Sequence, residues 1–119
     1  MTYISHRERV APAPPPAPTV KDMHRLTAAF LAVALSALAV GNIPGVLQAL
    51  DHAGVNLYPA LQPIIQSYYQ GLTLHGVLNV LVWTTFFICG FLPFVVAYDL
   101  QRPIWSLKLG WFTYWLMLF

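Results

Sequence analysis

Residues Gly71–Tyr98 read GLTLHGVLNVLVWTTFFICGFLPFVVAY, a run of 28 residues that contains no Asp, Glu, Lys or Arg. An α-helix needs about 20 apolar residues to cross the hydrocarbon core of a bilayer. The run is therefore predicted to span a membrane. Its exception is His75, because a polar ring in hydrocarbon costs free energy unless a side chain, a water or a metal satisfies its nitrogens.

A second run of this kind precedes it in the chain. Leu26–Leu50 (LTAAFLAVALSALAVGNIPGVLQAL) has 25 residues without a charge and predicts a first spanning helix over 26–50. Gly41, Pro44 and Gly45 are expected to loosen or kink its last turns. Of all 119 residues, 58% are hydrophobic and 8% are charged, whereas about a quarter are charged in a soluble domain. The composition therefore indicates a membrane protein.

The segments around these two runs decide the fold class. Residues 51–70 are expected to form an outer loop or a short interfacial helix. The second helix is expected to begin near Pro63, to cover 64–98 and to kink at Pro93. A third apolar segment, 104–119, has 16 residues, which is too short for a full crossing. We therefore predict an all-α membrane protein with two complete transmembrane helices and a truncated third, cut from a larger polytopic helix bundle.

The basic residues predict an orientation in the membrane. Residues 1–25 hold four of the six Lys and Arg residues and a proline-rich run, which indicates a disordered arm. The other two, Arg102 and Lys108, follow the second run, and residues 51–70 hold none. The positive-inside rule then places the arm in the cytoplasm and His75 near the outer face. The net charge of +2 is too small to indicate a nucleic-acid partner.

The surroundings of His75 leave two interpretations open. Spacings of three and four residues predict one face of the second helix that is made of Tyr68, Leu72, His75, Asn79, Val82 or Trp83, and Phe86. His75 either forms a hydrogen bond to another helix, with help from Asn79, or binds a metal such as haem iron, for which neutral imidazole is a common ligand.

The remaining histidines and the cysteine receive simpler interpretations. His6, His24 and His52 do not have the spacing of metal ligands and are not expected to bind a metal. Cys89 lies in an apolar run and is expected to be a small buried hydrophobic residue.

A longer stretch around His75 carries a resemblance to a known family. Ser67–Phe87 (SYYQGLTLHGVLNVLVWTTFF) resembles the second transmembrane helix of subunit I of the haem-copper oxidases, and is most similar to the B-family enzymes of the ba type. Gly45–Leu50 (GVLQAL) and the loop after it resemble the end of the first helix of that family and its outer loop. The resemblance covers residues 24–119, which form the transmembrane domain from residue 26 onward.

The resemblance implies a set of cofactor-binding residues. The histidine of this motif is an axial ligand of the low-spin haem in that family, which makes His75 the ligand of a haem b iron. Five further residues would border the haem: Tyr68, Leu72, Asn79, Gly45 and Gln48.

The resemblance also implies an activity and partners. The chain would be part of a cytochrome-c oxidase in a bacterial or archaeal plasma membrane. Electrons from cytochrome c would enter through a dicopper centre in subunit II and pass through the low-spin haem. They would reach a high-spin haem and copper, where oxygen is reduced to water while protons are translocated. The second axial histidine and the ligands of the high-spin haem and copper lie on later helices of the family. No catalytic residue is therefore expected in this chain, which would need the remainder of subunit I.

Two alternatives to this function are kept. A nitric-oxide reductase of the same superfamily also has a histidine in its second helix. A small haem-free accessory membrane subunit of two or three helices would need His75 for packing alone.

Overall fold

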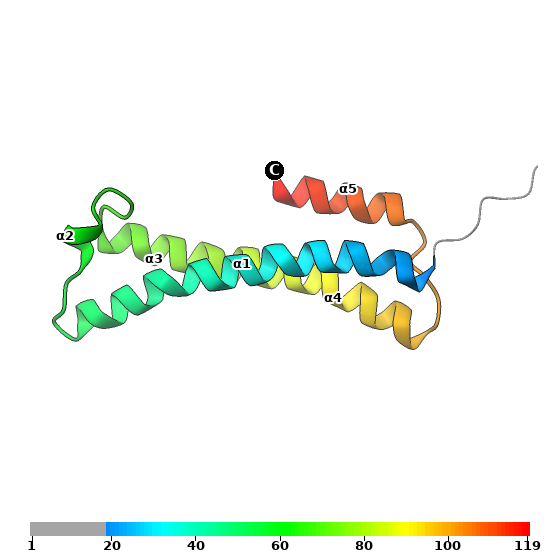
Figure 1. Cartoon of the computed structure of the whole chain (residues 1–119), viewed down its shortest axis with the longest axis horizontal. Coiled ribbons are helices and arrows are strands. Elements are labelled where there is room, and N and C mark those ends of the chain that lie inside the picture. Colours follow the sequence, from blue (N-terminus) through cyan, green and yellow to red (C-terminus); the bar gives the residue numbers. More distant parts are fainter. Residues whose placement is uncertain (1–18) are drawn as a thin grey trace, which may run out of the picture.

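The computed structural model describes residues 19–119, and within that range it is helical with no β-strand. Figure 1 shows two long antiparallel rods joined at one end, with a shorter helix beside one of them. In chain order the elements are α1 (Val20–His52), α2 (Tyr58–Leu61), α3 (Tyr68–Gly76), η1 (Val77–Trp83), α4 (Thr84–Asp99) and α5 (Leu107–Leu118). The predicted arm lies outside the described residues over 1–18.

The two rods confirm the predicted fold class. The first runs over Lys21–His52 and the second, formed by α3, η1 and α4 without a break, over Tyr68–Asp99; both have 32 residues and are long and apolar enough to cross a membrane. At a rise of 1.5 Å per residue each rod is about 48 Å long, which exceeds a hydrocarbon core of about 30 Å. The chain therefore contains a membrane-crossing helical hairpin.

The first helix starts earlier than the predicted residue 26. Thr19 is its N-cap, and the Asp22 carboxylate accepts hydrogen bonds from the Thr19 backbone N–H and hydroxyl, both at 2.8 Å. This pair satisfies donors at the helix terminus and places a negative charge at the positive end of the dipole. The prediction was wrong here because it began the helix where the apolar run begins, whereas the capping residues extend the helix to Val20.

The other two predicted helix starts were wrong in the opposite direction. The second rod begins at Tyr68 rather than residue 64, because the hydroxyl of Ser67 accepts from the Gln70 backbone N–H at 3.3 Å. The third helix begins at Leu107 rather than residue 104, capped in the same way by Ser106. Each serine is an N-cap: its side-chain oxygen accepts from a backbone N–H of the first turn and so determines the first residue of the helix.

The prolines lie where the helices tolerate them. Pro59 lies in the first turn of α2, where its missing N–H costs nothing. Pro44 and Pro93 lie inside α1 and α4, which continue through them. The last turns of α1, expected to loosen, are therefore helical as far as His52.

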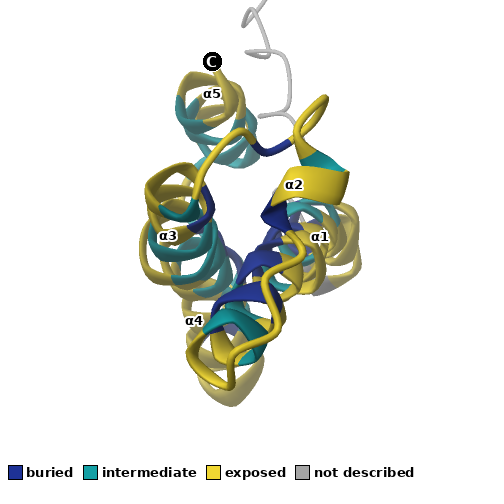
Figure 2. Ribbon diagram, turned by 90° about the vertical axis from the view of Figure 1, so that its left-hand side faces the viewer, coloured by how far each residue is buried: buried dark blue, intermediate teal, exposed yellow. Residues whose placement is uncertain are grey.

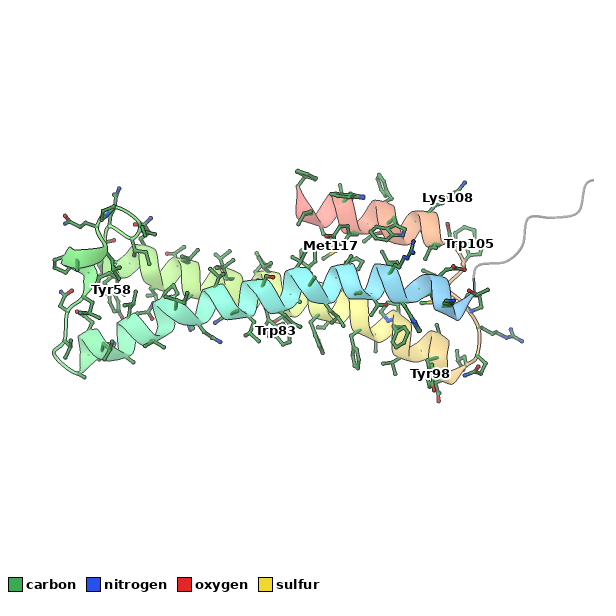
Figure 3. The ribbon with its side chains drawn as sticks, viewed as in Figure 1. Tyr58, Trp83, Tyr98, Trp105, Lys108 and Met117 are labelled. Carbon is green, nitrogen blue, oxygen red and sulfur yellow. The ribbon has the colours of Figure 1, made fainter. Side chains whose placement is uncertain are left out.

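The main core lies where α1 meets α4 and α5. Leu26, Phe30 and Ala34 of α1 and Phe86 of α4 form its buried centre. The ring of Phe30 contacts that of Tyr114 on α5 edge-on, with centroids 5.2 Å apart. Figure 3 shows Met117 pointing from α5 toward α1 and Lys108 pointing away. The core therefore joins all three long elements at one end of the molecule.

The outward faces of the rods are apolar and uncovered in this structure. Figure 2, a view along the rods, shows buried ribbon where α1 faces α3 and α4, and also at α2 and the loop beside it. Val80 and Leu81 of η1 are 74% and 62% exposed, and Phe112 of α5 is 62% exposed. Helices that are apolar on several faces are typical of segments surrounded by lipid or by further helices.

Candidate functional site

The His75 ring is held across the interface between the two rods. Its Nδ1 atom lies 2.7 Å from the backbone carbonyl oxygen of Gly41 on α1. A carbonyl oxygen only accepts hydrogen bonds, so Nδ1 must carry the proton and donate it. In a neutral imidazole, Nε2 then has a free lone pair. Nε2 has no hydrogen-bond partner among residues 19–119 and is not an enclosed atom. The ring therefore presents an available acceptor nitrogen.

Glycines on α1 allow the ring to approach so closely. A Cβ atom added at Gly45 would lie 2.7 Å from Cε1 of His75 and 2.9 Å from Nδ1. Gly41 lies one turn earlier on the same face, and its added Cβ would collide with Asn79. Two glycines four residues apart are a typical surface for close helix contact in membranes. Gly45, predicted to border a haem, therefore contacts the His75 ring itself.

Asn79 lies one turn beyond His75 and joins it to α1. Its Nδ2 atom is 3.2 Å from Nδ1 of His75 and 3.0 Å from Oδ1 of Asn42. Its own Oδ1 is buried and has no hydrogen-bond partner within residues 19–119. Asn79 therefore belongs to the contact between the rods. The sequence analysis did not identify Asn42 or the Gly41 carbonyl.

A π-helical segment begins directly after the His75 turn. In η1 the helix is wider than an α-helix, and the Thr84 hydroxyl donates to the Asn79 carbonyl, five residues earlier, at 3.3 Å. The predicted face assumed α-helical spacing throughout, yet His75, Asn79 and Phe86 all lie against α1 on both sides of this segment. Leu72, also predicted to lie on this face, is 44% exposed. π-Segments of this kind occur often at functional sites.

The loop end of the hairpin holds the remaining predicted residues. The Tyr68 hydroxyl lies 3.2 Å from Nε2 of His52, which is exposed as expected. Gln48 is 9% exposed, and its Nε2 atom has no hydrogen-bond partner in the described part of the chain. The structure therefore does not bring Tyr68 and Gln48 into contact with the His75 nitrogens, and places them toward the loop.

Tyr58, the first residue of α2, is a buried polar residue that the sequence analysis did not single out. It is 6% exposed, and Figure 3 shows it enclosed between the ends of α1 and α3. A Cβ atom added at Gly71 would lie 2.9 Å from its hydroxyl, so Tyr58 packs directly against Gly71. Burial, and secondarily the charge of Asp51, raises the pKa of Tyr58 above its usual value. Its hydroxyl is therefore neutral and, within residues 19–119, has no hydrogen-bond partner.

His75 is a single potential metal ligand in this part of the molecule. Within residues 19–119 there is no group of three His, Cys, Asp or Glu side chains placed to hold a metal ion. His24 contacts the ring of Phe94 with centroids 5.2 Å apart, and Cys89 is partly buried against the main core. His6 lies outside the described residues. A haem iron needs few protein ligands, so one available imidazole is chemically sufficient for half of an axial pair.

Comparison with known proteins gives two matches. Residues 25–119 match a family model described as cytochrome c and quinol oxidase polypeptide I. The chain is also similar to cytochrome c oxidase subunit 1 of Thermus thermophilus, with 42% identity over 96 residues. That alignment covers 77% of this chain and 17% of the relative. The chain thus spans about a sixth of the length of this relative.

Proposed function

The chain belongs to the family of cytochrome c and quinol oxidase polypeptide I, and from this premise we propose that it is part of the catalytic subunit of a haem-copper terminal oxidase. We propose further that Nε2 of His75 is an axial ligand of the low-spin haem. The support comes from the family match and from the contacts of the His75 ring.

The single observation that carries the ligand assignment is the hydrogen bond between His75 and Gly41. A metal-binding histidine usually donates its other ring N–H to a carbonyl or carboxylate, which fixes the ring and its tautomer. The 2.7 Å bond from Nδ1 to the Gly41 carbonyl has this form and leaves Nε2 accessible. A Cβ added at Gly76 would meet nothing within 4 Å, so the helix surface beside His75 is open. The residues present therefore fit a haem.

The protein residues contribute orientation and surroundings. A bound haem takes up and passes on single electrons. The Gly41 carbonyl keeps the Nδ1 proton in place and makes the imidazole a better donor. Gly45 lets the ring lie against α1, and the exposed side chain of Leu72 is free to lie against the macrocycle. Tyr68 and Gln48 would then border the haem on the loop side of His75. Asn79 would border it on the side of His75 away from the loop.

The finer parts of the proposal follow from the same premise. The haem is a haem b, as in B-family enzymes of the ba type. Because the chain covers 17% of its relative, the remainder of subunit I would supply the second axial ligand, the high-spin haem and the copper. Subunit II with its dicopper centre and cytochrome c would supply electrons. Oxygen would be reduced to water with proton translocation.

Membrane placement is the last part of the proposal. Residues 26–119 would form the first part of the transmembrane domain, and residues 1–25 a cytoplasmic arm that includes the start of α1. The membrane would be a bacterial or archaeal plasma membrane. A cysteine-labelling scan at His24, near the start of α1, and at Asn56, in the loop after α1, would test this orientation: only position 56 is expected to react from outside.

The comparisons favour an oxidase over the two alternatives. The family description and the name of the relative both refer to oxidases, and neither refers to nitric-oxide reduction or an accessory role. Oxygen uptake, with no nitric-oxide consumption, by the purified complex that contains this chain is the expected result. Consumption of nitric oxide as the main activity would contradict the proposal.

The ligand assignment is tested by His75→Ala in the assembled complex. We expect loss of the low-spin haem absorption band and of one haem in the pyridine haemochrome assay. His52→Ala is the matched control, because His52 is an exposed histidine at the outer end. A His75→Ala complex that keeps the low-spin spectrum would refute the assignment.

A further inference from the structure

We propose that Asn79 and Asn42 are a positioning pair for the His75 imidazole, and that they lower the reduction potential of the haem that it binds. The inference rests on the proposed function, since it takes His75 as the ligand. It concerns two residues that the structure brings together from opposite rods, 37 positions apart in sequence.

The first step is the chemistry of the contact between Asn79 and His75. Nδ1 of His75 is already a donor, because it lies 2.7 Å from the Gly41 carbonyl. The terminal atom of the Asn79 amide that lies 3.2 Å from Nδ1 is therefore stabilising only if it accepts a hydrogen bond. The amide oxygen and nitrogen of Asn are similar in size, so a half-turn of the Asn79 amide exchanges their positions. This rotation places Oδ1 beside Nδ1 of His75. The Nδ1–H then forms a three-centre bond to the Gly41 carbonyl and Asn79 Oδ1.

The second step is the role of Asn42. Its side-chain amide lies 3.0 Å from the Asn79 amide. With the Asn79 oxygen toward His75, the Asn42 amide rotates so that its NH₂ group donates to that same oxygen. Asn42 is exposed, so its amide is free to rotate in this way. Asn42 therefore selects the Asn79 orientation that accepts from the imidazole.

The third step explains why the pair is confined to this place. Gly41 has no side chain, and an added Cβ would collide with the Asn79 amide. Asn79 also lies in the π-helical segment. There its backbone carbonyl oxygen accepts a hydrogen bond from the Thr84 hydroxyl. The glycine on one rod and the π-segment on the other therefore fix the amide beside the ring.

The consequence is electronic. An acceptor on Nδ1–H increases the negative charge on the imidazole and strengthens donation from Nε2 to the metal. A stronger donor favours ferric over ferrous iron and lowers the reduction potential. A second acceptor adds to the effect of the Gly41 carbonyl, so removal of the Asn79 amide is expected to raise the potential.

The experiment is an optical redox titration of the low-spin haem in the purified complex. Asn79→Leu keeps the size of the side chain and removes the acceptor, and the midpoint potential is expected to rise. Asn42→Ala is expected to shift it in the same direction by less. Asn79→Asp keeps an oxygen beside Nδ1, so its potential is expected to stay at or below that of the wild type. Thr73→Val is the matched control, because the Thr73 hydroxyl bonds to the Tyr69 carbonyl of its own helix.

The outcomes separate this inference from the proposed function. An unchanged potential in Asn79→Leu with the haem bound would overturn the positioning pair and leave the ligand assignment intact. If Asn79→Leu does not assemble, Asn42→Ala and Asn79→Asp decide, and an unchanged potential in Asn42→Ala would count against the pair. Retention of the low-spin haem in His75→Ala would instead overturn the proposed function.

Discussion

The carbonyl oxygen of Gly41 on α1 accepts a hydrogen bond from Nδ1 of His75 on α3, 34 positions further along the chain, at 2.7 Å. This contact answers the question of how a polar ring is accommodated in an apolar helix. One ring nitrogen is satisfied within the hairpin and the other stays available. The two sequence-based interpretations of His75, a helix contact or a metal ligand, are therefore compatible with each other.

The glycine surface beneath the ring predicts the effect of adding one methyl group. In Gly45→Ala the new Cβ would lie 2.7 Å from His75 Cε1, which is closer than van der Waals contact. The ring must move, at a cost of about 1–3 kcal/mol for overpacking. We expect a lower melting temperature of the assembled complex and a perturbed low-spin haem spectrum. Val46→Ala, at a neighbouring position that is 61% exposed, is the control and should leave the spectrum unchanged.

The contact between Phe30 and α5 predicts a loss of stability in Phe30→Ala. Phe30 is 2% exposed and packs against Phe86 and Tyr114. In a soluble core this substitution costs about 3–5 kcal/mol; the cost should be smaller here, because lipid tails are as apolar as the protein interior. Thermal unfolding in detergent should show the loss. Phe91→Ala, at a position 42% exposed, should show a smaller one, and equal losses would contradict the assignment of Phe30 to the core.

The buried hydroxyl of Tyr58 predicts that its removal is tolerated. It has no hydrogen-bond partner within residues 19–119 and lies against Gly71. Tyr58→Phe removes an unpaired polar group and keeps the ring, so the free energy of unfolding should stay the same or rise by up to about 1 kcal/mol. Denaturation of the variant beside Tyr68→Phe, which loses a bond to His52, provides the comparison. A clear destabilisation by Tyr58→Phe would mean that a group outside residues 19–119 bonds to the hydroxyl.

The raised pKa of Tyr58 predicts a pH dependence at the loop end of the hairpin. Burial disfavours the tyrosinate, so its folded pKa lies above the unfolded value of about 10. The resulting stability is fully present below that unfolded pKa and is lost as the pH rises through the folded pKa. Wild-type protein should therefore lose stability above about pH 10 more steeply than Tyr58→Phe. Identical alkaline unfolding curves would show that Tyr58 does not contribute.

The sequence was sufficient for the spanning segments, and it singled out His75 as a polar ring within one of them. Both are properties of local composition: long uncharged runs specify membrane helices, and one imidazole within them is conspicuous. Helix boundaries were less predictable, because single side chains such as those of Thr19, Ser67 and Ser106 determine where each helix begins. Hydrophobicity carries no information about these caps.

The partners of His75 could not be predicted from the sequence. Gly41 and Asn42 contact His75 and Asn79 because of the register in which the two rods pack along their axes. Two glycines four residues apart in α1 were a usable signal for close contact, although they did not identify the residue that would fill the space. The π-segment has no clear sequence signal, and the assumption of α-helical winding throughout the second rod missed it.

The π-helical segment divides the second rod into two halves that are phased independently. A π-turn is equivalent to one extra residue wound into an α-helix, so deletion of a single residue from Val77–Trp83 would restore regular winding and rotate one half against the other by about 100°. After such a deletion, His75 and Phe86 could not both face α1: one of the two would be rotated away from it. A one-residue deletion in this segment therefore forces a choice between the ligand contact and the hydrophobic core, whereas the wild-type insertion allows both to be optimised separately.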